Sequence, residues 1–167
     1  MLENNKMKLI TNETKLFFYI DSDFKNWNVD EGVKTKVKKL EVKIQEKDFA
    51  FKDVFNTETD CVSQEQVIDW VKKNKNTLEK YICYFFLLKN SKGEFFVAHV
   101  FVYEDGSLRA FVSRFGYGFV WGANHRFRVV VPQLDSKTLS SLTLGNLDSL
   151  KLQPFIAELE TLIAKYK

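Results

Sequence analysis

Apolar and polar residues alternate in one segment of the first half of the chain, as a strand with one solvated face requires. Between Lys39 and Gln45 the apolar residues are Leu40, Val42 and Ile44, and the residues that separate them are charged. This period of two predicts a strand whose apolar side packs on a core and whose charged side faces water.

Continuous apolar runs instead indicate strands that are covered on both faces. Residues 82–88 and 95–103 form two such runs, so we expect these two strands in the centre of a sheet. A short polar segment joins the two runs, and Asp105-Gly106 after the second run is a hairpin signal. The pattern therefore predicts an antiparallel meander in residues 80–131. The predicted strands are 15–20, 38–47, 48–55, 80–89, 94–104, 107–115 and 126–132. Before the last of them, either 116–118 is a turn and a long strand runs from Phe119 to Val131, or 121–124 is the turn.

Helical spacing occurs at two places. Ser63 followed by Gln66 is a capping-box pattern, and the apolar stripe after it predicts one internal helix. Pro154 suits the first turn of a second helix, whose apolar residues recur at helical spacing as far as Tyr166. Short helical turns are expected at 136–142.

These elements predict an α+β fold, in which strands and helices occupy separate layers. We expect a curved antiparallel sheet of about six to seven strands, with one internal helix and a C-terminal helix packed on the sheet. The chain has no internal repeat and no Pro/Gly/Ser-rich linker. The prediction is therefore a single globular domain over residues 1–167, with a frayed segment at 1–12.

Composition places the chain among globular proteins, because 45% of its residues are hydrophobic and 15% are aromatic. No segment approaches the roughly 20 consecutive apolar residues that a membrane helix needs. The N-terminal residues lack the layout of a signal peptide. Cys61 and Cys83 do not make a disulfide framework. A cytoplasmic location and no contact with a membrane are the simplest interpretation.

The net charge of +3 is too small to imply a partner, but the charges are unevenly distributed. Residues 1–80 contain fifteen basic and fifteen acidic residues, so the excess lies in the second half. All four arginines of the chain fall within 109–128, and no acidic residue occurs between Asp105 and Asp135. This gap in negative charge indicates a candidate contact surface.

Arginine and aromatic residues in this segment are of the types that protein interfaces use most. We therefore expect a small binding or assembly protein, whose partner is another protein or a second copy of the chain. The alternative partner is nucleic acid, since arginine binds phosphate and aromatic rings stack on bases. The predicted partner-binding residues are Arg109, Arg114, Tyr117, Trp121, Arg126 and Arg128.

Residues 116–120 resemble in part the aromatic strand motif of RNA-recognition domains. Phe115 stands where that motif has a basic residue, and Gly122 stands where it has its last aromatic residue. No partner aromatic strand lies at the required distance before the motif. The match therefore assigns no family.

No arrangement of residues in the sequence predicts a catalytic, metal or cofactor site. Asp21–Gly32 has Lys25 and Asn26 at positions where a calcium loop needs a ligand and glycine. The cysteines and histidines lack metal-ligand spacing. These observations favour a binding protein over an enzyme. The remaining alternative is an enzyme or small-molecule binder with an apolar pocket between sheet and C-terminal helix, lined in part by His99 and Tyr103.

Overall fold

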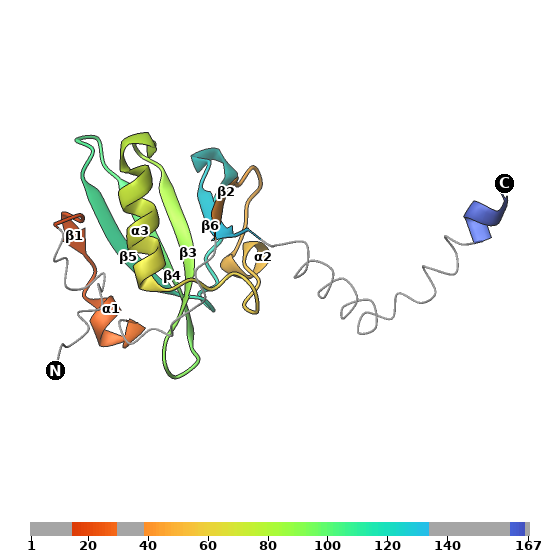
Figure 1. Cartoon of the computed structure of the whole chain (residues 1–167), viewed down its shortest axis with the longest axis horizontal. Coiled ribbons are helices and arrows are strands. Elements are labelled where there is room, and N and C mark those ends of the chain that lie inside the picture. The colour runs from red at the N-terminus through yellow and green to blue at the C-terminus, as the bar shows by residue number, and fades with distance from the viewer. Residues whose placement is uncertain (1–14, 30–38, 134–160, 166–167) are drawn as a thin grey trace. The chain divides into compact units, whose positions relative to one another are not determined.

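The computed structural model of the chain describes residues 15–29, 39–133 and 161–165. The chain divides into two compact units, Met1–Gln133 and Leu134–Lys167. In the second unit, residues 161–165 are helical (Figure 1). The start of the predicted C-terminal helix, its packing on the sheet, the turns at 136–142 and the frayed segment 1–12 lie outside the described residues. One domain over 1–167 stays a prediction.

The first unit is built on a six-stranded sheet with helices, which agrees with the predicted α+β class (Figure 1). The two apolar runs become β3 and β4, which lie in the interior of the sheet as their composition predicts. The strand predicted at 15–20 is limited to its last two residues. The strands are β1 (Tyr19–Ile20), β2 (Leu40–Ile44), β3 (Cys83–Lys89), β4 (Phe95–Val102), β5 (Leu108–Arg114) and β6 (Arg128–Pro132), in the spatial order β1-β5-β4-β3-β6-β2.

The sheet is mixed, so the prediction of a wholly antiparallel sheet is wrong. β3, β4 and β5 form the predicted antiparallel meander, and β2 is antiparallel to β6. However, β6 is parallel to β3, and β1 is parallel to β5. After β5 the chain crosses to the far side of β3 instead of turning back beside β5. A strand that arrives by such a crossover can run parallel to its neighbour, whereas a tight hairpin cannot.

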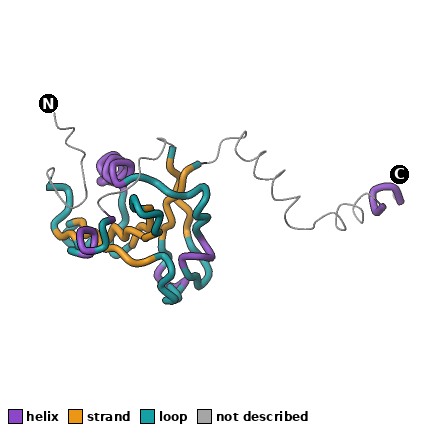
Figure 2. The backbone as a smooth tube through the Cα atoms, turned by 90° about the horizontal axis from the view of Figure 1, so that it is seen from below, coloured by secondary structure: helices purple, strands orange, loops and turns teal. Residues whose placement is uncertain are grey.

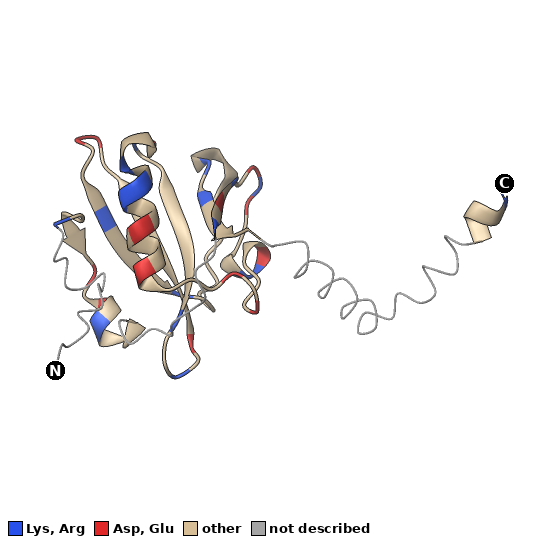
Figure 3. Cartoon of the chain, viewed as in Figure 1, with Lys and Arg blue, Asp and Glu red and all other residues tan. Residues whose placement is uncertain are grey.

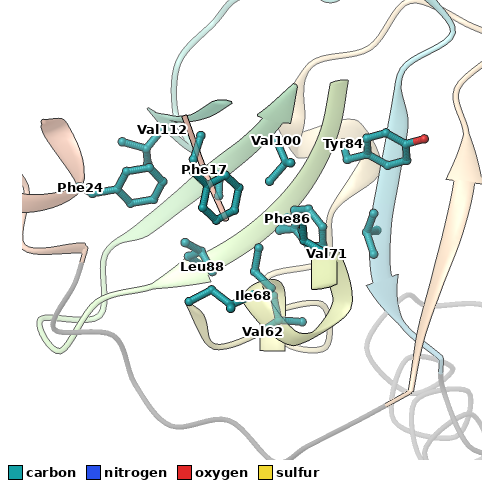
Figure 4. Packing of buried hydrophobic residues seen from close by; sticks show 14 of the residues in the cluster. Phe17, Phe24, Val62, Ile68, Val71, Tyr84, Phe86, Leu88, Val100 and Val112 are labelled. Atoms are coloured by element: carbon teal, nitrogen blue, oxygen red, sulfur yellow. The ribbon is translucent and has the colours of Figure 1, made fainter. Parts of the chain in front are cut away.

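Helix α3 (Gln64–Asn74) covers one face of the sheet (Figures 1 and 2). The Ser63 hydroxyl accepts a hydrogen bond from the Gln66 backbone N–H at 3.2 Å, and the Gln66 side chain accepts one from the Ser63 backbone N–H at 2.9 Å. This capping box starts the helix. Val67, Ile68 and Val71 then enter a buried cluster with the even-numbered residues of β3, β4 and β5 (Figure 4).

The opposite face of the sheet is covered by the segments 49–55 and 115–127. Residues 48–55, predicted as a strand, instead contain the short helix α2 (Phe51–Val54), with one isolated bridge from Phe49 to Trp121. A continuous strand would place Asp53 on the same buried face as the phenylalanines on either side of it. One helical turn turns Asp53 out to solvent, where its carboxylate accepts the Ala50 backbone N–H at 2.8 Å. The buried residues of this second core are Phe49, Phe51, Phe55, Cys83, Phe85, Leu87, Val97, Val129 and Val131.

Candidate functional site

The four arginines do not share one surface. Arg109 pairs in register with Phe101 on the face opposite α3, whereas Arg114 pairs with Phe96 on the face that α3 covers. The guanidinium carbon of Arg114 lies 4.7 Å from the ring centre of Trp27. Figure 3 likewise shows basic residues scattered over several elements and mixed with acidic ones along α3. The stretch of sequence without acidic residues therefore does not form one basic face of the folded chain.

Arg128, the first residue of β6, is a buried structural residue with only 3% of its surface exposed. Its Nη2 lies 2.6 Å from Oε1 of Glu79, and its Nη1 donates to the backbone carbonyl of Arg126. The Glu79 backbone N–H in turn donates to the Tyr84 hydroxyl at 3.0 Å. Burial raises the pKa of that hydroxyl above its ordinary value. These bonds tie β6 to the start of β3, and Arg128, which the sequence predicts to bind a partner, is buried.

Replacing Arg128 with alanine is expected to lower the free energy of unfolding by about 2 kcal/mol, because a buried stem and an ion pair are both lost. Arg126→Ala is the matched control. Arg126 is exposed and lies just before the strand with a left-handed backbone (φ 48°), and we expect a change within about 0.5 kcal/mol. Urea unfolding measures both variants, and equal losses would contradict the structural role of Arg128.

Trp121 and Tyr117 come from one loop but have different surroundings. The Trp121 ring centre lies 5.0 Å from that of Phe85, 5.3 Å from that of His99 and 5.2 Å from that of Phe127. Its backbone also exchanges two hydrogen bonds with Phe49, at 2.8 and 3.1 Å. Tyr117 is 59% exposed and stacks on Phe119, with ring centres 6.2 Å apart. Trp121 therefore holds the loop on the sheet, whereas the Tyr117 side chain is exposed.

His99 is enclosed by the same aromatic rings. Its ring centre is 4.8 Å from that of Phe85, and its Nε2 has no hydrogen-bond partner among the described residues. Burial lowers the pKa of His99 to about 3, so the imidazole is neutral at pH 7. Burial also raises the pKa of the Cys83 thiol well above its ordinary value. The His99 imidazole is therefore not protonated and the Cys83 thiol is not ionised at pH 7. Neither side chain carries the charge that a cationic binding site or a thiolate nucleophile needs. The predicted pocket beside the C-terminal helix lies outside the described residues.

Arg109 instead belongs to an aromatic surface that the sequence pattern did not reveal. Its guanidinium carbon lies 3.7 Å from the ring centre of Tyr103 and 5.5 Å from that of Phe18. The rings of Tyr19 and Phe111 approach to 5.4 Å, and those of Phe101 and Tyr103 to 5.1 Å. Phe18 is 76% exposed, and Tyr19 and Tyr103 are also exposed. We call Phe18, Tyr19, Phe101, Tyr103, Arg109 and Phe111 the Arg109 surface.

This surface forms because β1 pairs with β5 in parallel, which sets Tyr19 directly beside Arg109. The only local signal for Phe18 is that Phe17, Phe18 and Tyr19 are three consecutive aromatic residues. Phe17 is buried in the core, and the chain bends at Phe18, so Phe18 and Tyr19 are both exposed. The pairing with Arg109 has no local signal, since the two segments lie far apart in the chain.

Among the residues that the structure describes, no helix is long and apolar enough to cross a membrane. Within 15–29, 39–133 and 161–165, no three His, Cys, Asp or Glu side chains lie close enough together to hold a metal ion. Comparison of this chain with protein-family models, with curated proteins and with solved structures finds no match.

Proposed function

We propose that this chain is a non-enzymatic binding protein that contacts another protein through the Arg109 surface. The observation that carries the proposal is Arg109 lying 3.7 Å over the Tyr103 ring, on a sheet face that also exposes Phe18 and Tyr19. Arginine and tyrosine are the residues that most often dominate the binding energy of protein interfaces. An arginine already held on aromatic rings loses little conformational entropy when a partner binds.

The scattered arginines favour a protein over a polyanion as the partner. Binding to a phosphate backbone draws its energy from several cationic side chains on one surface. Here Arg128 is buried against Glu79, and Arg114 lies on the other face of β5 from Arg109. Two acidic residues, Glu104 and Asp105, directly follow Tyr103 of the Arg109 surface in the sequence, in the turn between β4 and β5. Nucleic acid stacking on Tyr19 and Phe111 remains the second candidate, because both rings are at least partly exposed.

The effect of Phe18→Ala on partner binding tests the proposal. Phe18 is largely exposed, so we expect its removal to leave the melting temperature nearly unchanged. Binding of a partner captured by the wild-type chain should weaken about tenfold or more, since each 1.4 kcal/mol of lost contact is tenfold. Arg109→Ala should have a larger effect in the same titration, with its melting temperature measured alongside.

Tyr117→Ala is the matched control, because Tyr117 is an exposed aromatic residue outside the Arg109 surface. If this variant loses the partner and Phe18→Ala does not, the contact lies on the loop after β5 and the proposal is overturned. Anisotropy titrations of single-stranded RNA and DNA at about 50 and 200 mM salt test the second candidate. Tight binding that collapses at the higher salt would favour nucleic acid.

A further inference from the structure

Strand β2 ends the sheet on the side opposite β1, and its outer edge is paired with no strand that the structure describes (Figure 1). The backbone carbonyl of Lys39 accepts the Gln133 N–H at 2.7 Å, and the Gln45 N–H donates to the Phe127 carbonyl at 2.9 Å. In an antiparallel pair the backbone groups of successive residues point alternately toward and away from the neighbour. The N–H and C=O groups of Leu40, Val42 and Ile44 therefore point to the free edge.

The side chains of β2 are of two kinds. On the face shared with α3, Val42 and Ile44 are 43% and 46% exposed, so the prediction that the apolar side of this strand packs on a core is wrong for these two residues. On the opposite face, Glu41 and Lys43 are both solvent-accessible, and the Lys43 Nζ lies 3.5 Å from Oε1 of Glu41. An edge strand with exposed apolar residues and free backbone groups is a template for pairing with another strand.

We propose that β2 pairs with β2 of a second copy of this chain, antiparallel and with the two-fold axis at Val42. In this register Val42 faces the partner's Val42, and Leu40 faces the partner's Ile44. Their outward backbone groups then bond to each other, and the exposed Val42 and Ile44 side chains are covered. A pairing of one strand with itself closes after two copies, as a two-fold interface requires.

Charge complementarity selects this register. With the axis at Val42, Glu41 lies directly opposite the partner's Lys43, and Lys43 lies opposite the partner's Glu41. These are non-hydrogen-bonded pairs, in which the Cα atoms approach to about 4.5 Å and the side chains are closest. The two existing Glu41–Lys43 pairs would therefore merge into a group of four alternating charges.

The neighbouring registers are unfavourable. Moving the axis to Glu41 sets Glu41 against its own copy and Lys43 against Lys39, and moving it to Lys43 sets Lys43 against its own copy. Like charges directly opposite each other destabilise a strand pair. Registers in which even residues face odd residues fail for another reason, because the backbone groups of the odd residues already bond to β6.

The β2 edge and the Arg109 surface lie at opposite ends of the sheet, so the two proposals fail independently. Sedimentation of the full chain over about 1 to 200 µM measures self-association. We expect a concentration-dependent dimer for the wild-type chain. E41K and K43E should each raise the dissociation constant about tenfold, because attractive pairs become repulsive. K92E changes the net charge as K43E does, in the turn between β3 and β4, and should leave the dimer intact.

Two restorations make the test specific. An equal mixture of E41K and K43E should form heterodimers, since each chain then presents the charges that the other lacks. The double variant E41K/K43E should dimerise like the wild type, because the exchange preserves complementarity. A wild-type chain that stays monomeric over the whole concentration range would overturn the proposal. A dimer that neither single variant weakens, or that neither restoration rescues, would also overturn it.

Discussion

Lowering the pH from about 7 to 4 is expected to cost the folded chain about 3 kcal/mol of stability through His99 alone. Burial among aromatic rings lowers the pKa of His99 to about 3, whereas an unfolded chain leaves a histidine at its ordinary value near 6.5. Between these two values the unfolded chain binds a proton that the folded chain does not. The stability is therefore complete above about pH 6.5 and is lost as the pH falls toward 3.

Urea unfolding of the wild type and of His99→Phe at several pH values measures this effect. Carboxylates contribute equally to both proteins, so the difference between the two pH profiles isolates His99. The His99→Phe profile should be flatter by about 3 kcal/mol between pH 7 and 4. His125→Phe removes the other histidine of the chain, which is exposed, and serves as the control for the substitution itself. Parallel profiles for wild type and His99→Phe would show that the imidazole is not enclosed as described.

Trp121→Ala is expected to lower the free energy of unfolding by about 3 kcal/mol, a typical cost for truncating a large aromatic side chain in a core. The Trp121 ring packs against the rings of Phe85, His99 and Phe127. Its loss would leave a cavity over the sheet and release the loop that covers β3 and β6. Thermal and urea unfolding measure the change.

Tyr117→Ala on the same loop is the control, and we expect its stability to change by less than about 0.5 kcal/mol. A small effect of Trp121→Ala would place Trp121 at the surface, as the sequence had suggested for a partner-binding residue. A large effect means that Trp121 can alter partner binding only by changing the loop. The two substitutions therefore separate the structural aromatic residues of the loop from the accessible ones.

Local patterns predicted the parts of this fold whose causes are local. The alternation around Val42 marks a strand, and Ser63 with Gln66 marks the start of α3, because both depend on residues a few positions apart. The apolar runs of β3 and β4 also placed these strands correctly in the interior of the sheet. In each case the side chains of a segment determine the backbone conformation of that same segment.

Local sequence patterns did not reveal contacts between residues that lie far apart in the chain. A period of two says which residues share a face, but it does not say which strand lies beside it or in which direction that strand runs. The parallel pairing of β1 with β5 joins Phe18 and Tyr19 to Arg109, and the crossover to β6 buries Arg128 against Glu79. The helical turn at Asp53 has the same origin, since a core that must bury Phe51 and Phe55 cannot also bury the carboxylate between them. Burial of the whole set of apolar side chains selects these arrangements, and no single segment contains that information.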